Sequence, residues 1–81
     1  MNDADKEALI RLLLAGHIRD DNSILVSLND QVHARFPVRQ VVNGYEVDEF
    51  VLNGVFSVDM LKAMLWWAEH MDFGRPIIAS P

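Results

Sequence analysis

The feature that most constrains the fold of this chain is a twelve-residue stretch, from Gln31 to Val42, in which apolar and polar residues alternate. One parity is apolar at five of its six positions and the other at only one, with Pro37 counted apart. Successive side chains of a β-strand point to opposite faces, whereas a helix repeats its apolar positions every 3.6 residues. The stretch is therefore predicted to be a long strand with one apolar face. The residues expected on that face are Val32, Ala34, Phe36, Val38, Gln40 and Val42.

Pro37 interrupts this strand, because proline has no backbone N–H to donate to a ladder. We expect it at an edge position or at a bulge that divides the strand. The alternative is that residues 30–36 form a short helix that ends at Pro37, with Val32 and Phe36 one turn apart.

A tight hairpin turn is predicted at Asn43-Gly44, since both residues tolerate the positive φ angles that such a turn requires. The turn pairs Val42 with Tyr45 and Gln40 with Val47, and we expect both pairs on the core face. It also pairs Arg39 with Asp48 as opposite charges on the outer face, which we expect to be polar. The apolar parity changes after Glu49, which predicts a bulge near Asp48 or Glu49.

The strand before this hairpin is expected at Ile24–Leu28. A two-residue turn at Asn29-Asp30 would mix the two faces of the sheet, so we predict a three-residue loop that also includes Leu28 and places Val26 opposite Val32. Val55-Phe56 is expected to add a short fourth strand after the second Asn-Gly pair.

Two helices flank the strands. The first is predicted from Asp3 to Ala15, and its apolar stripe is unusually wide, about 200°; neighbouring loops or a second protein would cover its flanks. The second is expected to begin after Ser57 and to run to about Asp72. The apolar Ile77-Ile78-Ala79 segment is expected to lie against the body of the protein. The chain is thus predicted to be one two-layer α+β domain, residues 1–81, in which both helices pack on one face of an antiparallel meander of three or four strands.

The composition excludes most catalytic chemistry. The chain has no cysteine, its four glycines are scattered, and its three histidines lie far apart in the sequence, so we expect neither a metal site, a cofactor nor an enzyme. Glu46 and Asp48 share one side of a strand, but an exposed sheet does not shift carboxyl pKa values as catalysis requires. We expect these two residues to contact a partner, for which a basic surface would be complementary.

No segment resembles a membrane span or a leader peptide. The longest stretch without a charged residue runs only from Phe50 to Val58, whereas a spanning helix needs ~20 apolar residues. The chain starts with an acidic segment, where a leader peptide would be basic. A soluble, cytoplasmic protein that does not contact membranes is expected.

Trp66 is the most informative single residue. The stripe of Met60, Met64, Trp67 and Met71 defines the core side of the second helix, and Trp66 points about 130–160° away from it at 100° per residue. Tryptophan on a polar helix face is enriched at interface hot spots, although the first helix or the C-terminal isoleucines could cover it. The surface expected to bind a partner consists of Ala63, Trp66, His70 and Phe73, with Glu46 and Asp48 on the sheet.

These observations favour a small acidic protein-interaction module, such as an inhibitor, adaptor or assembly subunit of the kind that phages and mobile elements encode. It would bind a protein partner or form a homodimer. The alternative is a nucleic-acid-binding regulator that uses His33, Arg35 and Arg39 on the outer sheet face. The chain has a net charge of −5 and no basic segment, so nucleic acid is a poor partner.

Overall fold

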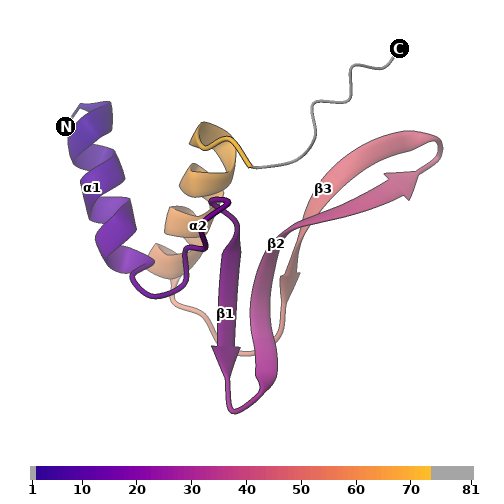
Figure 1. Ribbon diagram of the computed structural model, residues 1–81, viewed down its shortest axis with the longest axis horizontal. Helices are drawn as coiled ribbons and strands as arrows, with labels where there is room; N and C mark the ends of the chain where they lie inside the picture. Colours follow the sequence, from indigo (N-terminus) through magenta and orange to yellow (C-terminus); the bar gives the residue numbers. More distant parts are fainter. Residues whose placement is uncertain (1, 74–81) are drawn as a thin grey trace.

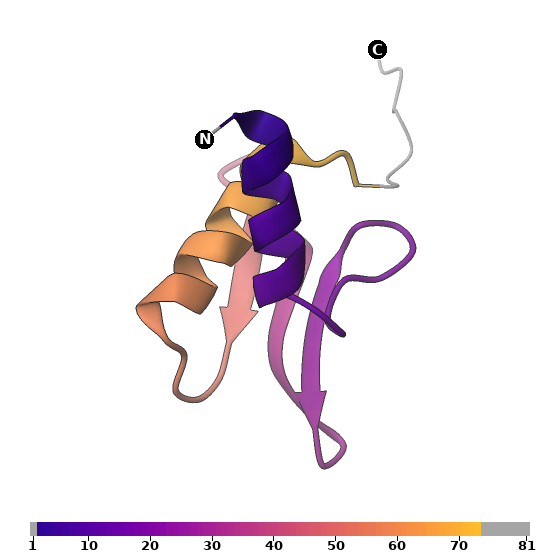
Figure 2. The same cartoon turned by 90° about the vertical axis from the view of Figure 1, so that its left-hand side faces the viewer.

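A computed structural model describes residues 2–73 and shows a three-stranded antiparallel sheet with two helices on one side of it (Figure 1). The sheet order is β1-β2-β3, so the strands form a meander. Seen from the side, α1 and α2 lie next to each other in front of the sheet and run in opposite directions (Figure 2). This arrangement confirms the predicted α-β-β-β-α order and two-layer α+β class. The elements are α1 Asp3–Leu13, β1 Ile24–Leu28, β2 Gln31–Val42, β3 Tyr45–Leu52 and α2 Val58–His70.

Both helices begin where predicted, α1 at Asp3 and α2 after Ser57, and each follows a capping side chain. The side chain of Asn2 accepts a hydrogen bond from the backbone N–H of Asp5 at 2.8 Å, and the Ser57 hydroxyl oxygen accepts one from Met60 N–H at 3.0 Å. Such caps satisfy N–H groups that have no partner in the first turn. Both helices end about two residues earlier than predicted. In α2 the reason is that Met71 adopts an extended conformation.

The stretch from Gln31 to Val42 is one strand, so the short helix considered for residues 30–36 is excluded. Val55 and Phe56 are not in a strand, and the sheet has three strands within residues 2–73.

The loop between β1 and β2 differs from the prediction. Leu28 pairs with Gln31, so the turn contains only Asn29 and Asp30, both with positive φ angles of 53° and 63°. The register then shifts between Val26 and Ser27, because β2 contains one extra residue at this point. The predicted three-residue loop was therefore wrong. A bulge, rather than a longer loop, keeps Val26 opposite Ala34 on the core side, while Val32 pairs with Ser27 and lies on the other face, where it was not predicted.

A second register shift lies at Pro37. Arg35 pairs with Val51 and Val38 pairs with Glu49, so two residues of β2, Phe36 and Pro37, lie opposite Phe50 alone. A bulge at Pro37 was one of the two predicted possibilities. The change of parity in this hairpin was expected to come from a bulge in β3 near Glu49, but the extra residue belongs to β2.

This second bulge reverses which side chains of β2 face the helices. Phe36 lies on the core side, where its ring stacks on that of Phe50 with 4.1 Å between the centroids. Asp48 is two residues from Phe50 in a regular strand, so it shares that face, and its partner Arg39 does too. The Arg39–Asp48 pair was predicted correctly, but it lies on the face that continues the core and not on the outer face.

Val38 and Val42 consequently lie on the face away from the helices, and the far part of the hairpin projects beyond the helices (Figure 1). Val42 is 47% exposed and Tyr45 is 75% exposed. The prediction that the Val42–Tyr45 and Gln40–Val47 pairs belong to the core face was wrong.

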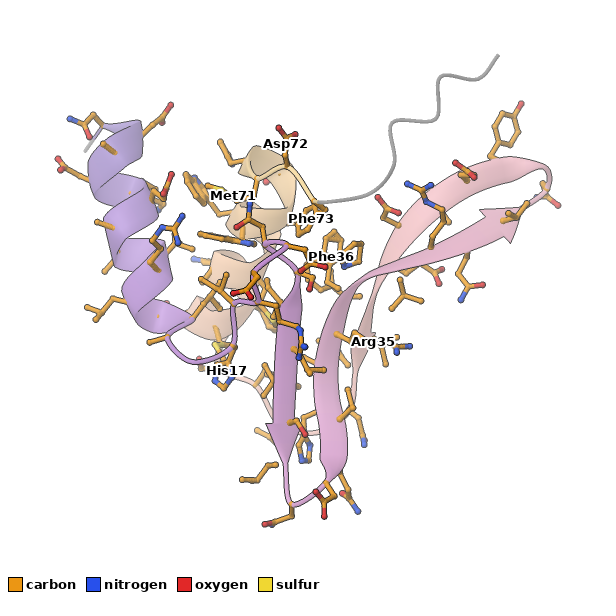
Figure 3. The ribbon with its side chains drawn as sticks, in the orientation of Figure 1. His17, Arg35, Phe36, Met71, Asp72 and Phe73 are labelled. Carbon is orange, nitrogen blue, oxygen red and sulfur yellow. The ribbon has the colours of Figure 1, made fainter. Side chains whose placement is uncertain are left out.

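The core lies between the helices and the near half of the sheet. It contains Ile10, Leu14, Ile24, Ala34, Phe36, Ala63, Met64, Trp67 and Phe73. Phe73 reaches it because the chain turns out of α2 at Met71, and its ring meets Phe36 edge-on with 5.1 Å between centroids (Figure 3). The apolar segment from Ile77 to Ala79 lies outside the described residues.

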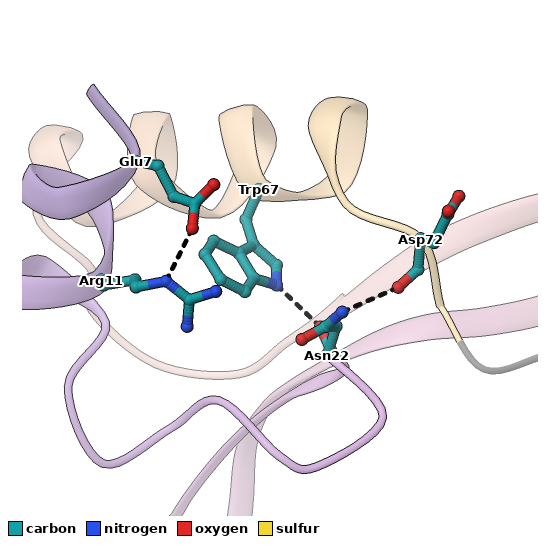
Figure 4. A network of polar contacts seen from close by, with 5 residues as sticks. All are labelled: Glu7, Arg11, Asn22, Trp67 and Asp72. Atoms are coloured by element: carbon teal, nitrogen blue, oxygen red, sulfur yellow. Dashed lines mark hydrogen bonds and ion pairs between the residues drawn. The ribbon is translucent and has the colours of Figure 1, made fainter. Parts of the chain in front are cut away.

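Trp67 is the centre of this core and is fully buried. Its indole Nε1–H donates a hydrogen bond of 2.7 Å to the backbone oxygen of Asn22, and the Asn22 side chain donates to the backbone oxygen of Asp72 at 3.1 Å (Figure 4). The Arg11 guanidinium lies 4.8 Å from the centre of the Trp67 ring and is paired with Glu7 at 2.9 Å. The two hydrogen bonds join the loop before β1 to the C-terminal part of α2 and to the segment that follows it.

Candidate interaction surface

The residues predicted to bind a partner do not form one surface in the structure. Trp66 is half-buried and stacks on His70, with ring centroids 4.1 Å apart and planes within 10° of parallel. His70 Nδ1 lies 2.9 Å from the backbone oxygen of Trp66, to which it donates. This hydrogen bond and the stacking hold both rings in fixed orientations at the end of α2.

Ala63 and Phe73 offer little surface to a partner. Ala63 is fully buried and Phe73 is only 9% exposed. Sequence reasoning placed Phe73 beside Trp66 by continuing α2 to about residue 72. The helix ends two residues earlier, and the Phe73 ring packs on Phe36 in the core instead.

Glu46 and Asp48 lie apart from α2, on the projecting hairpin. Both carboxylates face Arg39, at 3.5 Å and 3.6 Å from its guanidinium nitrogens. Their negative charge is thereby partly compensated within the chain, which reduces the attraction they would exert on a basic partner.

The structure instead shows a groove between α1 and α2, on the side of the helical layer away from the sheet. Its volume is about 450 Å³. The buried side chains of Ile10 and Ala63 form its floor, and Trp66 forms part of one wall. The other apolar walls are Leu9, Leu13 and Leu65, which are 40%, 41% and 55% exposed.

Sequence reasoning anticipated part of this groove. The wide stripe of α1 predicted that its flanks would be covered either by loops or by another protein. Within residues 2–73 only one flank stays open: Leu12 is 72% exposed, whereas Leu14 on the other flank is fully buried in the core. Leu65 was missed, because it lies outside the stripe of α2 that defines the core, although it immediately precedes Trp66.

Four charged side chains line the rim of the groove: Lys6, Asp59, Lys62 and Glu69. No ion pair or side-chain hydrogen bond joins any of them to another described residue. Two lysines and two acids make the rim neutral, although the chain as a whole has a net charge of −5.

The three basic residues considered for nucleic-acid recognition are divided between the two faces of the sheet. Arg35 points away from the helices (Figure 3), whereas His33 is the extra residue of the first bulge, lines a hollow with Val26 and Phe56, and contacts the Asn53 backbone oxygen at 3.0 Å. Arg39 lies on the face opposite to Arg35 because of the bulge at Pro37. Its guanidinium forms ion pairs with Glu46 and Asp48. The three basic residues therefore do not form a single basic surface.

Within residues 2–73 there is no cluster of three or more potential metal ligands, and no polar or charged side chain is buried. Hydrogen bonds from the Ser23 hydroxyl and then from the Ser23 backbone N–H lower the pKa of the Asp21 carboxyl group.

Among the residues that the structure describes, no helix has the length and apolar character needed to cross a bilayer. The chain matches no protein-family model, no curated protein and no solved structure.

Proposed function

We propose that this chain is a non-enzymatic protein-interaction module, an inhibitor, adaptor or assembly subunit that binds a protein partner or itself through the groove between α1 and α2. The observation that carries the proposal is the apolar lining of the groove, Leu9 and Leu13 on α1 and Leu65 and Trp66 on α2, which nothing in residues 2–73 covers.

An apolar surface of this kind is costly for an isolated domain. Each large aliphatic side chain gains about 1.5–3 kcal/mol when it is fully removed from water. A chain of 81 residues buries only a small core. Leucines that stay on its surface therefore do not contribute the free energy of burial to the stability of the isolated domain. Contiguous apolar patches on small proteins mark sites of interaction, and a tryptophan beside leucines matches the composition of interface hot spots.

The proposal is tested by substitution of Leu65 with glutamate, using Val55→Glu as a matched control. Val55 is 102% exposed and lies outside the groove, so both variants add one negative charge at an exposed apolar position. The assay measures association of the purified chain with itself and with any protein recovered from its host, once that protein has been purified. We expect Leu65→Glu, but not Val55→Glu, to weaken the association. Association that both variants retain would refute the use of this groove, and the absence of any association would refute the proposal itself.

A further inference from the structure

We infer that the occupant of the groove is the same face of a second copy of this chain, in a dimer with two-fold symmetry. The inference rests on the proposed function and narrows its partner to the chain itself.

The four charged side chains at the rim of the groove favour a second copy of the chain as its occupant. Because α1 and α2 are antiparallel, Lys6 at the start of α1 lies toward the same end of the groove as Glu69, and Asp59 and Lys62 lie at the other end (Figures 1 and 2). Each end of the groove thus offers one positive and one negative charge.

This pattern is complementary to itself. In a two-fold dimer whose axis runs along the groove, α1 of each copy faces α2 of the other, so Lys6 of each copy can face Glu69 of the other at one end. At the other end Asp59 and Lys62 lie about one turn apart on α2, and their opposite charges cancel. A strongly basic partner would meet Lys6 and Lys62, and a strongly acidic one would meet Asp59 and Glu69. Like charges across an interface are costly, so the neutral rim favours a partner with the same mixed charges.

The distribution of leucines points to the same occupant. At 100° per residue, Leu12 lies 60° beyond Leu9 on α1, further from the core, and Leu65 and Val58 lie close together on the outer side of α2. Leu12 and Val58 are 72% and 66% exposed. A peptide lying in the groove would leave these flanks in water. Two further helices packed across the layer would cover the groove and its flanks together, as in a four-helix arrangement.

The first experiment is sedimentation equilibrium of the wild-type chain and of the Leu65→Glu and Val55→Glu variants, each checked for native helix content by circular dichroism. We expect a wild-type dimer, a dissociation constant raised at least ~30-fold by Leu65→Glu, and no change with Val55→Glu. A wild-type chain that stays monomeric at millimolar concentration overturns the inference. So does a dimer that Leu65→Glu leaves intact, because its contacts would then lie elsewhere.

The second experiment tests the charge argument with two complementary variants. Lys6→Glu with Lys62→Glu makes the rim wholly acidic, and Asp59→Lys with Glu69→Lys makes it wholly basic. We expect each variant to dimerise more weakly than the wild-type chain, and an equimolar mixture to form a heterodimer. Unchanged dimers of both variants, or no heterodimer in the mixture, would overturn the inference.

Failure of the inference and failure of the proposed function can be told apart. If the wild-type chain is monomeric but a purified partner binds it and not Leu65→Glu, the groove is an interaction site for a different protein. If neither a second copy of the chain nor another protein binds through the groove, the two-fold dimer and the proposed function are both wrong.

Discussion

Substitution of Trp67 with alanine should remove most of the stability of this domain. The ring is fully buried, and truncation of a buried tryptophan costs about 3–5 kcal/mol through lost burial and the cavity left behind. The variant also loses the 2.7 Å hydrogen bond to Asn22, worth about 1 kcal/mol, and the contact with Arg11. A domain of 81 residues has a free energy of unfolding of roughly 4–12 kcal/mol, so a loss of about 5 kcal/mol approaches or exceeds its lower limit.

Trp66→Ala is the matched control for Trp67→Ala. Trp66 is the adjacent residue and the same side chain, but it is half-buried and its indole nitrogen makes no hydrogen bond to another residue within 2–73. We expect this variant to lose about 1–2 kcal/mol, since part of the ring surface remains in water in the folded chain.

Urea denaturation followed by circular dichroism measures both losses without depending on tryptophan fluorescence. At about 1 kcal/mol per molar urea, Trp66→Ala should lower the midpoint by 1–2 M, whereas Trp67→Ala should lower it by about 5 M. Trp67→Phe keeps most of the ring but not the hydrogen bond to Asn22, and should lose about 2 kcal/mol with a measurable transition. Equal losses for the Trp66 and Trp67 alanine variants would refute the assignment of the two rings to different environments.

Two further predictions concern the loops. Asp30→Gly should stabilise the chain by about 0.5 kcal/mol in urea titrations, because Asp30 has a φ of 63° in a two-residue turn; a destabilised variant would argue against that turn. Ser23→Ala should raise the pKa of Asp21 toward its ordinary value, as measured by NMR titration of the carboxyl carbon. Because folding lowers this pKa, the interaction stabilises the chain at neutral pH and is lost as the pH falls from the ordinary value through the lowered one; an unchanged pKa in the variant would contradict this assignment.

Local physical chemistry in the sequence was sufficient for the order and type of the elements. The helices begin at Asn2 and Ser57 because a side-chain oxygen there can satisfy N–H groups of the first turn, and this depends only on residues three positions apart. The Asn43-Gly44 turn likewise determines its own pairing, so Arg39 and Asp48 were correctly placed opposite each other. Trp67 could be assigned to the core because it continues the methionine stripe of α2.

The faces of the sheet could not be derived in this way. A single extra residue reverses the side-chain direction of everything that follows it in a strand, and the strand that accommodates the bulge depends on how both strands meet the core. The stacking of Phe36 on Phe50 accompanies the bulge in β2 at Pro37, with the result that Val42 and Tyr45 are exposed where alternation alone predicted burial.

The candidate site depended even more on tertiary structure. Periodicity shows how wide an apolar stripe is, but not which part of it a second helix covers. The antiparallel packing of α1 on α2 buries Ile10 and Ala63 and leaves Leu9, Leu13 and Leu65 along an open groove. The sequence by itself determined that the chain has more apolar helix surface than its small sheet can cover. Only the packing of the two helices decided where the uncovered part lies, because that depends on contacts between residues about fifty positions apart.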